Sequence, residues 1–479
     1  MMKILSKFPG FYSDIRFWIL LFFIIRLVGI TNPPLEVAHH WRQTTVTMVA
    51  RNFLEVDNNI FYPRIDIAGD KTGITGMEFP LLNYLIYLVS VVFDYAHWYG
   101  RLINLVVSSV GIFFFYKLII KYFNSKIAFC AAWIVLYSIW FIYSRKIMPD
   151  TFSMSLIFIG MYFGSNYLDN PSDRSRWKNL ILYMIFITLG ILTKLTAGYL
   201  PAVFLLFFFN PKIPLSRKVV FSAASIVCII IPATWYFIWT PWLVETYGFW
   251  HFFMGVDILQ GIQEIGQNLP QTLNRFYESA IKYVGFAFFL FGLSVAFWRK
   301  DKLLTALFLI SFPLFLVTVF KAGYTFPHHS YYIIPFVPVM ALFAGFGISQ
   351  IKSRKIVFII LTAIALEGIL NQYDDFFIPE KQRVILNLET DLDRLSGRND
   401  LILINSGYLP TPMYFAHRKG WVLPNEDIQN QAYLQELIDS GLRYIVIIKR
   451  TFGTPTQLEL PVVFEDENYC IYSIENGAE

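Results

Sequence analysis

Long apolar runs recur along almost the whole chain, and short segments rich in Lys and Arg separate them. Each run has roughly 13 to 21 residues, which is close to the length that a helix needs to cross the hydrocarbon core of a bilayer. The composition agrees, because 56% of the 479 residues are hydrophobic and only 15% are charged, whereas a soluble domain has about 25% charged residues. The sequence therefore predicts an all-α polytopic membrane protein.

The basic segments indicate the direction of each crossing, because short cytoplasmic loops are enriched in Lys and Arg. Basic residues gather at 3–16, 117–126, 174–178, 212–218, 299–302 and 352–355. With all six segments in the cytoplasm, the N-terminus lies inside and the C-terminal region lies outside. The net charge of +5 is then a topology signal. It gives no support to nucleic-acid binding, because the basic residues are spread over many loops.

This threading gives about eleven crossings. The expected spans are residues 17–30, 102–120, 127–144, 151–168, 179–194, 197–209, 219–239, 284–298, 303–320, 331–349 and 356–371. The apolar run 81–97 is not counted as a crossing. Only one crossing is possible between the outer loop 32–80 and the basic segment 117–126, and the run 102–120 provides it. We expect this run to lie as an interfacial or re-entrant helix on the outer face.

Two domains are expected. Residues 1–371 form the transmembrane domain, with long outer loops at 32–80 and 240–283, and residues 372–479 form a small α/β domain on the outer side. In the latter, "DLILIN" and "RYIVIIK" predict buried strands, "NQAYLQELIDSG" predicts an amphipathic helix, and "PVVFEDENYCIYSI" predicts a hairpin. The three cysteines are far apart, so no disulfide framework or CxxC metal motif is expected.

The first outer loop is the most polar part of the transmembrane domain. Its stretch "EVAHHWRQTTVTMVARNF" begins at Glu36 and contains no further carboxylate before Glu55. Apolar residues at helical spacing predict a helix lying along the surface. Farther on, Glu78 stands between Gly-rich turns and a Pro-led apolar helix, a position that suits a general base. The simpler alternative is a hydrated acid near a helix N-terminus, where negative charge is favoured anyway.

Several cations lie at the outer ends of spans, although Lys and Arg are normally enriched in the cytoplasmic loops. Arg145, Lys146 and Asp150 lie in "SRKIMPDTFSM", and Lys194 lies in "GILTKLTAGYLP". An anionic ligand such as a lipid-linked phosphate would account for them, although a lysine near a helix end also snorkels to the interface.

All seven histidines, at 39, 40, 97, 251, 328, 329 and 417, fall on the outer side of this threading. His328 and His329 are adjacent, so their side chains diverge and are unsuited to chelating one metal. Contact of one of them with substrate is the better interpretation.

These stretches, taken in order from residue 15 to about 371, resemble the GT-C glycosyltransferases. The resemblance is to the bacterial branch related to protein O-mannosyltransferases and the lipid A aminoarabinose transferase. It implies an inverting transferase of the bacterial inner membrane, with a polyprenyl-phosphate sugar as donor and an active site facing the periplasm. The family's acid-proline motif matches "EFP", which gives Glu78 a role near substrate or metal, and the family's acid at the end of the third span matches Asp150.

The chain departs from this family at the start of the first surface helix. Many relatives carry an acid there that serves as the base, but aligning on "ARNF" places Arg42 and Gln43 at those positions. The base must then be Glu36, His40 or Glu78. In the hypothesis that follows, it deprotonates an acceptor hydroxyl on a glycolipid, a glycan or a protein.

The other charged residues have roles in the same hypothesis. Asp150 positions the sugar or a divalent metal, for which Glu78 is the second candidate ligand. The residues expected to neutralise the leaving phosphate are Arg42, Arg145, Lys146 and Lys194.

Two other classes of protein fit the hydropathy pattern. A non-catalytic transporter or flippase of lipid-linked oligosaccharides would need polar residues at mid-membrane depth, but the mid-span segments are almost purely apolar apart from Arg26 and Glu367. A polymerase or ligase with a diphosphate donor would gather its basic residues in one large outer loop, and loop 240–283 has only Arg275 and Lys282.

Overall fold

The computed structural model describes residues 14–169, 175–250 and 255–474. Lys3, Lys7, Arg174 and His251 lie outside these ranges. The chain divides into two compact units, each of which is described by itself. Unit 1 consists of Met1–Ile30, Arg101–Trp235 and Phe253–Asp374, and unit 2 of Thr31–Gly100, Tyr236–Phe252 and Asp375–Glu479.

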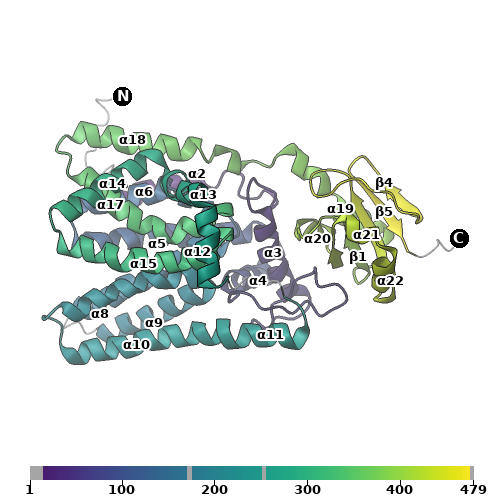
Figure 1. Ribbon diagram of the computed structural model, residues 1–479, viewed down its shortest axis with the longest axis horizontal. Coiled ribbons are helices and arrows are strands. Elements are labelled where there is room, and N and C mark those ends of the chain that lie inside the picture. Colours follow the sequence, from purple (N-terminus) through teal and green to yellow (C-terminus); the bar gives the residue numbers. More distant parts are fainter. Residues whose placement is uncertain (1–13, 170–174, 251–254, 475–479) are drawn as a thin grey trace. The chain divides into compact units, whose positions relative to one another are not determined.

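Unit 1 is a bundle of apolar helices (Figure 1). Each expected span corresponds to a helix or to a pair of successive helices. These elements are α2 (Ile15–Ile25), α5 (Tyr99–Tyr122), α6 (Ser125–Tyr137), α7 (Trp140–Tyr143), α8 (Pro149–Asp169), α9 (Arg176–Thr193), η2 (Leu195–Phe209), α10 (Leu215–Thr234), α14 (Lys282–Trp298), α15 (Lys302–Ala322), η5 (Ser330–Phe336), α17 (Val337–Ser349) and α18 (Arg354–Leu370). After α10, η3 (Trp235–Trp239) continues from unit 1 into unit 2. The connections contain α12 (Ile258–Gln267), α13 (Leu269–Asn274), η4 (Arg275–Ala280) and α16 (Thr325–His328).

Among the described residues, five helices are long and apolar enough to cross a membrane, and seven if each of two bent pairs counts as one span. The five are Tyr99–Tyr122, Arg176–Thr193, Leu215–Tyr247, Lys302–Ala322 and Ser330–Ser349. Helices α2, α6 and η2 are apolar but shorter. The prediction of a multi-pass helical membrane protein is confirmed, and the figure of eleven crossings stays a prediction.

Small residues let α17 approach its neighbours closely. A Cβ atom added at Gly292 of α14 would lie 1.9 Å from the carbonyl oxygen of Phe343, and one added at Gly345 would lie 2.7 Å from the backbone nitrogen of Ala131 in α6. Close backbone contact through small residues is how helices pack where the surrounding solvent is as apolar as the side chains. Helix α17 therefore lies in the centre of the bundle, and nearly all of its residues are buried.

Unit 2 contains the mixed sheet expected near the C-terminus. The elements along the chain are η7 (Glu380–Ile385), α19 (Leu388–Leu395), β1 (Leu401–Ile404), α20 (Thr411–Ala416), β2 (Lys419–Val422), α21 (Asn425–Ile428), α22 (Gln431–Asp439), β3 (Leu442–Ile448), β4 (Val462–Glu465) and β5 (Tyr469–Ser473). The sheet order is β2-β1-β3-β5-β4, with β1 parallel to both β2 and β3 and with β4 and β5 forming an antiparallel hairpin. The expected strands, helix and hairpin are confirmed. Strand β2 and the short helices η7, α19, α20 and α21 were not predicted.

The first outer loop and the C-terminal region share one hydrophobic core in unit 2. Leu35, Met48 and Ile65 pack with Ile402 of β1 and Met413 of α20 in the same cluster. The opposite face of the sheet is covered by α22. The expected boundary between residues 371 and 372 stays a prediction, but within unit 2 residues 31–100 and 375–479 stabilise each other.

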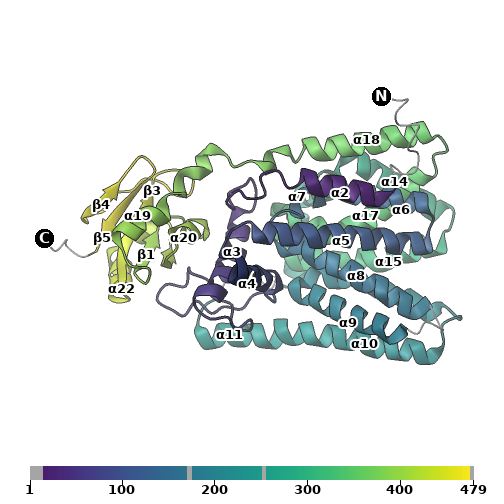
Figure 2. The same ribbon diagram turned by 180° about the vertical axis from the view of Figure 1, so that it is seen from behind.

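The first outer loop forms two helices, α3 (His40–Glu55) and α4 (Leu81–Phe93) (Figure 2). Helix α3 differs from the expectation of a surface helix, because its residues 42 to 53 are buried. Its threonines make this possible: the hydroxyls of Thr45 and Thr47 donate to the carbonyls of Trp41 and Gln43, four residues back. A sequence that looks polar can thus lie inside the protein. Helix α4 has 13 residues and exposes an apolar end at residues 91–93, as an interfacial helix would.

Candidate functional site

The backbone is strained where α3 begins. Ala38 and His39 have φ values of 59° and 58°, so two consecutive non-glycine residues adopt the left-handed conformation. Such strain persists only where the surrounding structure enforces it, and it is concentrated at functional sites. Glu36 is completely buried just before this bend, and His40 and Arg42 follow directly after it.

Arg42 and Glu78 form an ion pair in unit 2. The guanidinium Nη2 of Arg42 contacts the carboxylate Oε1 of Glu78, and the two side chains are 10% and 4% exposed. The amide of Asn83 in α4 donates to the carbonyl of Val46 in α3 at 2.9 Å, which fixes the two helices beside the pair. The structure thus brings together two residues to which the sequence assigned different roles, phosphate binding and proton transfer.

His40 is in contact with the C-terminal part of unit 2. Its Nδ1 atom lies 2.9 Å from the hydroxyl of Thr411 in α20. The imidazole also packs edge-on against Phe452, with the ring centres 5.3 Å apart. Two residues from the sheet domain therefore hold this ring at the N-terminus of α3.

In unit 1, Lys194 and Asp150 form a second pair. The Nζ atom of Lys194 lies 3.7 Å from Asp150 Oδ1 and lies over the rings of Tyr331 and Tyr332, at 5.5 and 6.0 Å from their centres. Asp150 is in the first turn of α8 and is 3% exposed. Its other oxygen, Oδ2, has no hydrogen-bond partner in the part of the chain that the structure describes.

Four further cations are completely buried in unit 1: Arg26, Arg101, Arg145 and Lys146. Arg145 donates to the carbonyl of Val28 at 2.7 Å, and Arg101 donates to that of Ile30 at 3.2 Å. These carbonyls follow the C-terminal end of α2, where cations are favoured by the helix dipole. These carbonyls hold the two guanidinium groups in place.

Asn104 shapes the turn that carries Arg145 and Lys146. Its amide nitrogen donates to the carbonyls of Tyr143, Lys146 and Met148 at 3.0, 2.9 and 3.2 Å. Sequence reasoning missed both Asn104 and Arg101. The available signal was a pair of polar residues three positions apart inside an apolar run, which is unusual in a span.

The two adjacent histidines have different surroundings. His328 is exposed and stacks on Tyr324, with the ring centres 4.0 Å apart. His329 is half-buried, and burial lowers its pKa, as do the nearby charges of His328, Arg275 and Lys194. His329 therefore lies close enough to Lys194 to be affected by its charge. Arg275, also missed, donates two hydrogen bonds to the carbonyl of Pro327, at 2.9 and 2.6 Å.

The two acids expected to hold a divalent metal lie in different units, and each faces a cation, Glu78 facing Arg42 and Asp150 facing Lys194. Among the described residues, no group of three or more His, Cys, Asp or Glu side chains is arranged to bind a metal ion. The donor set found among the described residues of each unit does not fit a metal.

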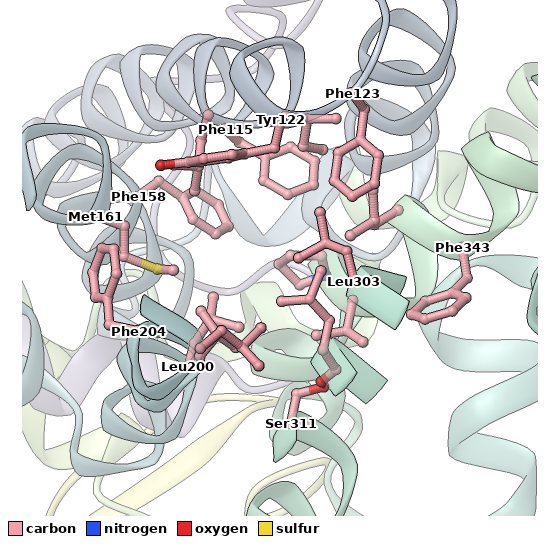
Figure 3. A pocket seen from close by; sticks show the side chains of 18 of the residues that line it. Phe115, Tyr122, Phe123, Phe158, Met161, Leu200, Phe204, Leu303, Ser311 and Phe343 are labelled. Carbon is pink, nitrogen blue, oxygen red and sulfur yellow. The ribbon is translucent and has the colours of Figure 1, made fainter. Parts of the chain in front are cut away.

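Unit 1 also contains a cavity of about 280 Å³. It lies among α5, α8, η2, α15 and α17, and its lining is almost entirely apolar. Figure 3 shows side chains that line it, which include Phe115, Tyr122, Phe123, Phe158, Met161, Leu200, Phe204, Leu303, Ser311 and Phe343. Its apolar lining suits a hydrocarbon chain.

These features define a multi-pass helical membrane protein with a small C-terminal α/β part. Residues 77–239 match the model of the family described as dolichyl-phosphate-mannose-protein mannosyltransferase. No curated protein matches the sequence significantly.

Particular solved structures share the fold over nearly the whole chain. ArnT from Cupriavidus metallidurans in the apo state has 12% sequence identity and a TM-score of 0.59, over 95% of this chain and 97% of ArnT. The same protein bound to undecaprenyl phosphate gives a TM-score of 0.60 at 12% identity, over 95% and 98% of the two chains.

The archaeal oligosaccharyltransferase AglB from Archaeoglobus fulgidus, in complex with an inhibitory peptide and a dolichol-phosphate, gives a TM-score of 0.54 at 13% identity. The match covers 90% of this chain and 69% of AglB. The resemblance to the GT-C glycosyltransferases, in the branch of the protein O-mannosyltransferases and the aminoarabinose transferase, is confirmed.

Proposed function

We propose that this protein is a membrane glycosyltransferase that moves a sugar from a polyprenyl phosphate to an acceptor hydroxyl. The observation that carries the proposal is the group of buried cations in unit 1, which consists of Arg26, Arg101, Arg145 and Lys146, together with Lys194 beside Asp150. Burying charge in an apolar helical bundle is costly. A phosphate group would bind at such a cluster of cations, because hydrogen bonds between oppositely charged groups are strong in apolar surroundings.

The apolar cavity supports a lipid-linked donor. Asp150 lies at the start of α8, and Phe158 and Met161 of the same helix line the cavity. At about 1.5 Å per residue, they stand about 12 and 16 Å along the helix from Asp150. A hydrocarbon chain whose phosphate lies near Lys194 would reach the cavity along the same helix. The ArnT structure with bound undecaprenyl phosphate is a precedent for this class of ligand in the fold.

The proposed reaction is a single inverting displacement. The acceptor oxygen attacks the anomeric carbon, the bond from that carbon to the phosphate oxygen breaks, and polyprenyl phosphate leaves with the electron pair. Arg145, Lys146 and Lys194 neutralise the phosphate, with Arg42 as a further phosphate-binding cation. Asp150 positions the sugar, and His329 contacts substrate beside Lys194; His328, which is exposed, is the weaker candidate for such a contact.

The proton of the acceptor hydroxyl passes to Glu36, Glu78 or His40. Glu78 is held by Arg42, Glu36 is buried before the strained bend, and His40 is the first residue of α3. All three belong to unit 2. Acceptors of the proposed class carry hydroxyl groups on a glycolipid, a glycan or a protein.

We place the protein in the bacterial inner membrane, with a cytoplasmic N-terminus and with residues 372–479 in the periplasm. The six basic segments support this orientation, since it puts all of them in the cytoplasm. The loops 32–80 and 240–283 then lie on the same side as the C-terminal domain.

The alternative is a flippase that translocates a lipid-linked oligosaccharide without chemistry. A glycan path through the bundle would need polar walls, whereas the cavity in unit 1 is lined mainly by Phe, Leu and Val. Mass spectrometry of membrane glycolipids and glycans from a deletion strain tests the proposal. We expect one sugar to be missing from one glycoconjugate. A deletion strain with every glycoconjugate unchanged would overturn the glycosyltransferase assignment.

A further inference from the structure

The turn that follows β1 in unit 2 carries one tyrosine on its outside. Tyr408 is 81% exposed and is the most exposed tyrosine that the structure describes, whereas Asn405 and Ser406 just before it are 3% and 4% exposed. Tyrosine side chains are usually at least partly buried, because most of the ring is apolar. An exposed aromatic ring next to buried polar residues is therefore a candidate contact surface for a ligand.

Hydrogen bonds fix the turn that carries this ring. The hydroxyl of Ser406 donates to the carbonyl of Leu409 at 2.9 Å, and the N–H of Leu409 donates to the carbonyl of Ser406 at 3.1 Å. The N–H of Gly407, which has a φ of 60°, donates to the carbonyl of Leu423 after β2 at 3.1 Å. Because the turn is ordered before a ligand arrives, stacking on Tyr408 costs little conformational entropy.

A network of side-chain amides lies beside this turn and joins the loops that follow β1, β2 and β3. Asn405 donates to the side-chain oxygen of Asn425 at 3.1 Å and to the carbonyl of Thr454 at 2.8 Å. Asn425 donates to the carbonyl and to the hydroxyl oxygen of Thr454, at 3.1 and 2.8 Å. The Thr454 hydroxyl accepts this bond and is exposed, so its own proton is available to a ligand from solvent. Amide and hydroxyl groups thus accompany the aromatic ring on the surface.

The sheet topology places these groups at a usual position for a binding site. Strand β1 pairs with β2 on one side and with β3 on the other, and all three strands are parallel. Ligands of open α/β sheets bind outside the carboxyl ends of the strands, at the point where the connections reverse. Tyr408, Asn425 and Thr454 follow the carboxyl ends of β1, β2 and β3.

The groups at this position favour a saccharide over a peptide. A sugar ring has an apolar face of C–H groups, which stacks on an aromatic ring, and hydroxyls, which bond to amide and hydroxyl groups. A peptide is usually recognised through a free strand edge, an apolar groove or a cluster of charges. The outer edge of β2 is closed here, because Gly420 donates to the carbonyl of Asp66 at 3.0 Å and accepts from the N–H of Gly69 at 2.8 Å.

The turn also lies close to the start of α3. Thr411 is three residues after Tyr408, and its hydroxyl oxygen lies 2.9 Å from His40 Nδ1. Three residues span at most about 10 Å. A saccharide that stacks on Tyr408 is therefore bound near the N-terminal end of α3, where Glu36 and His40, two of the candidate bases, are found in the same unit.

We propose that Tyr408, Asn425 and Thr454 form a saccharide-binding surface that holds the glycan part of the acceptor. This inference rests on the proposed glycosyltransferase function. It selects an acceptor that carries carbohydrate, a glycan or a glycolipid, over a protein. The surface binds and orients the acceptor and takes no part in breaking or forming bonds.

The first test is photo-crosslinking in intact cells of a deletion strain that expresses the full-length protein. Replacing Tyr408 by p-benzoylphenylalanine keeps an aromatic ring at this position and attaches a bound molecule on illumination, and mass spectrometry identifies the adduct. Val462 of β4, which is 50% exposed in the same sheet, is the control position. We expect a saccharide adduct at position 408 and none at position 462. A peptide adduct at position 408, or no adduct there, would overturn the proposal.

The second test measures transfer to the glycoconjugate extracted from the deletion strain, which lacks the sugar. Tyr408→Ser removes the ring from an exposed turn, so we expect the KM for this acceptor to rise about 3- to 10-fold, with kcat within about twofold of the native value. Tyr408→Trp keeps an aromatic ring and should restore the lower KM. Val462→Ser, the same kind of change elsewhere in the sheet, should leave both constants unchanged. A native KM in Tyr408→Ser would contradict the saccharide-binding surface.

The two proposals fail differently, because the crosslink does not require transfer. A deletion strain that lacks a sugar, combined with no saccharide adduct at position 408 and a native KM in Tyr408→Ser, would overturn the saccharide-binding surface and leave the glycosyltransferase standing. A saccharide adduct at position 408 in a deletion strain that lacks no sugar would overturn the glycosyltransferase and support a saccharide-binding surface without transfer.

Discussion

Lys194 and Asp150 face each other at 3.7 Å in unit 1, and two tyrosine rings lie under the ammonium group. The pair is nearly buried, since its side chains are 14% and 2% exposed. If the lipid phosphate binds here, Lys194 attracts it and Asp150 repels it. The two residues therefore make opposite contributions to the affinity for the phosphate alone.

Replacing Lys194 by Met should weaken the binding of undecaprenyl phosphate. A hydrogen bond to a charged group contributes about 1.5–3 kcal/mol, which is about 10- to 100-fold in affinity. Binding of radiolabelled undecaprenyl phosphate to purified protein measures this. Lys355→Met, in the exposed first turn of α18, is the matched control, and equal affinities for both variants would remove Lys194 from the phosphate site.

Replacing Asp150 by Asn should have the opposite effect on the affinity for undecaprenyl phosphate, measured in the same assay. Removing the negative charge strengthens the binding of undecaprenyl phosphate, while sugar transfer falls because the sugar loses its anchor. Weaker phosphate binding in Asp150→Asn would contradict this arrangement. The comparison separates a role in holding the sugar from a role in holding the phosphate.

Replacing Glu78 by Gln tests the buried pair with Arg42. Removing one partner of a buried ion pair leaves an uncompensated charge and costs about 3–5 kcal/mol, so we expect a lower unfolding temperature. Arg42→Met combined with Glu78→Gln should recover part of this loss, as a double-mutant cycle of thermal unfolding would show. A Glu78→Gln protein that folds, inserts and transfers sugar at the native rate would exclude Glu78 as the base.

Filling the cavity in unit 1 should weaken the binding of a lipid chain. Met161→Trp places a larger side chain against the lining, and we expect a loss of at least about tenfold in affinity for undecaprenyl phosphate. Inorganic phosphate should bind as before. Leu290→Trp, at a position of α14 that is 46% exposed, controls for the added bulk. An unchanged affinity in Met161→Trp would place the lipid chain elsewhere.

The stability of unit 2 should depend on pH through His417. Burial lowers the pKa of His417, but its hydrogen bonds with Glu389 at 2.7 Å and Glu55 at 2.8 Å outweigh burial, so its pKa is raised. A group with a raised pKa stabilises the fold below its unfolded value, and this stabilisation is lost as the pH rises through the folded value. Other charges near His417 are Arg51, which repels the imidazolium, Asp66, and Arg398, which pairs with Glu389.

We therefore expect the unfolding temperature to fall as the pH is raised from about 6 to 9. Both carboxylates are partly exposed, so solvent screening limits the contribution to about 1 kcal/mol, or about 2–4 °C. His417→Gln should remove this dependence, whereas His328→Gln, at an exposed site in unit 1, should retain it. The pKa of Glu389 is lowered to about 2, chiefly by its hydrogen bond to His417, so the pair persists in moderate acid. An unfolding temperature that rises over the same range would contradict the assignment.

Much of the fold was predictable because its signals are local. A run such as residues 102–120 must be a helix in lipid, and α5 occupies Tyr99–Tyr122. Strands β1 and β3 were recognisable as short apolar runs bounded by polar residues and turns. Strand β2 was missed because "KGWV" is short and carries a glycine, and a parallel pairing with β1 gives it its conformation.

The burial of α3 could not be predicted in the same way. Its threonines and arginines look like a solvated face, because a hydropathy pattern does not record which carbonyl each hydroxyl bonds. Arg42 was recognised as a cation and Glu78 as an acid, but their pairing across 36 positions depends on how α3 and α4 pack.

The chemistry of the residues and the spacing of the apolar ones were enough to determine the helical bundle, the small sheet and the charged residues at the outer ends of the spans. Only the tertiary structure decided which residues form hydrogen bonds and ion pairs with each other. Such contacts depend on distances of a few ångströms between atoms, and not on separation along the chain. His40 and Thr411 are 371 positions apart and meet at 2.9 Å. Nothing local to either residue specifies that contact, which arises because the first outer loop and the sheet domain bury their apolar residues in one core.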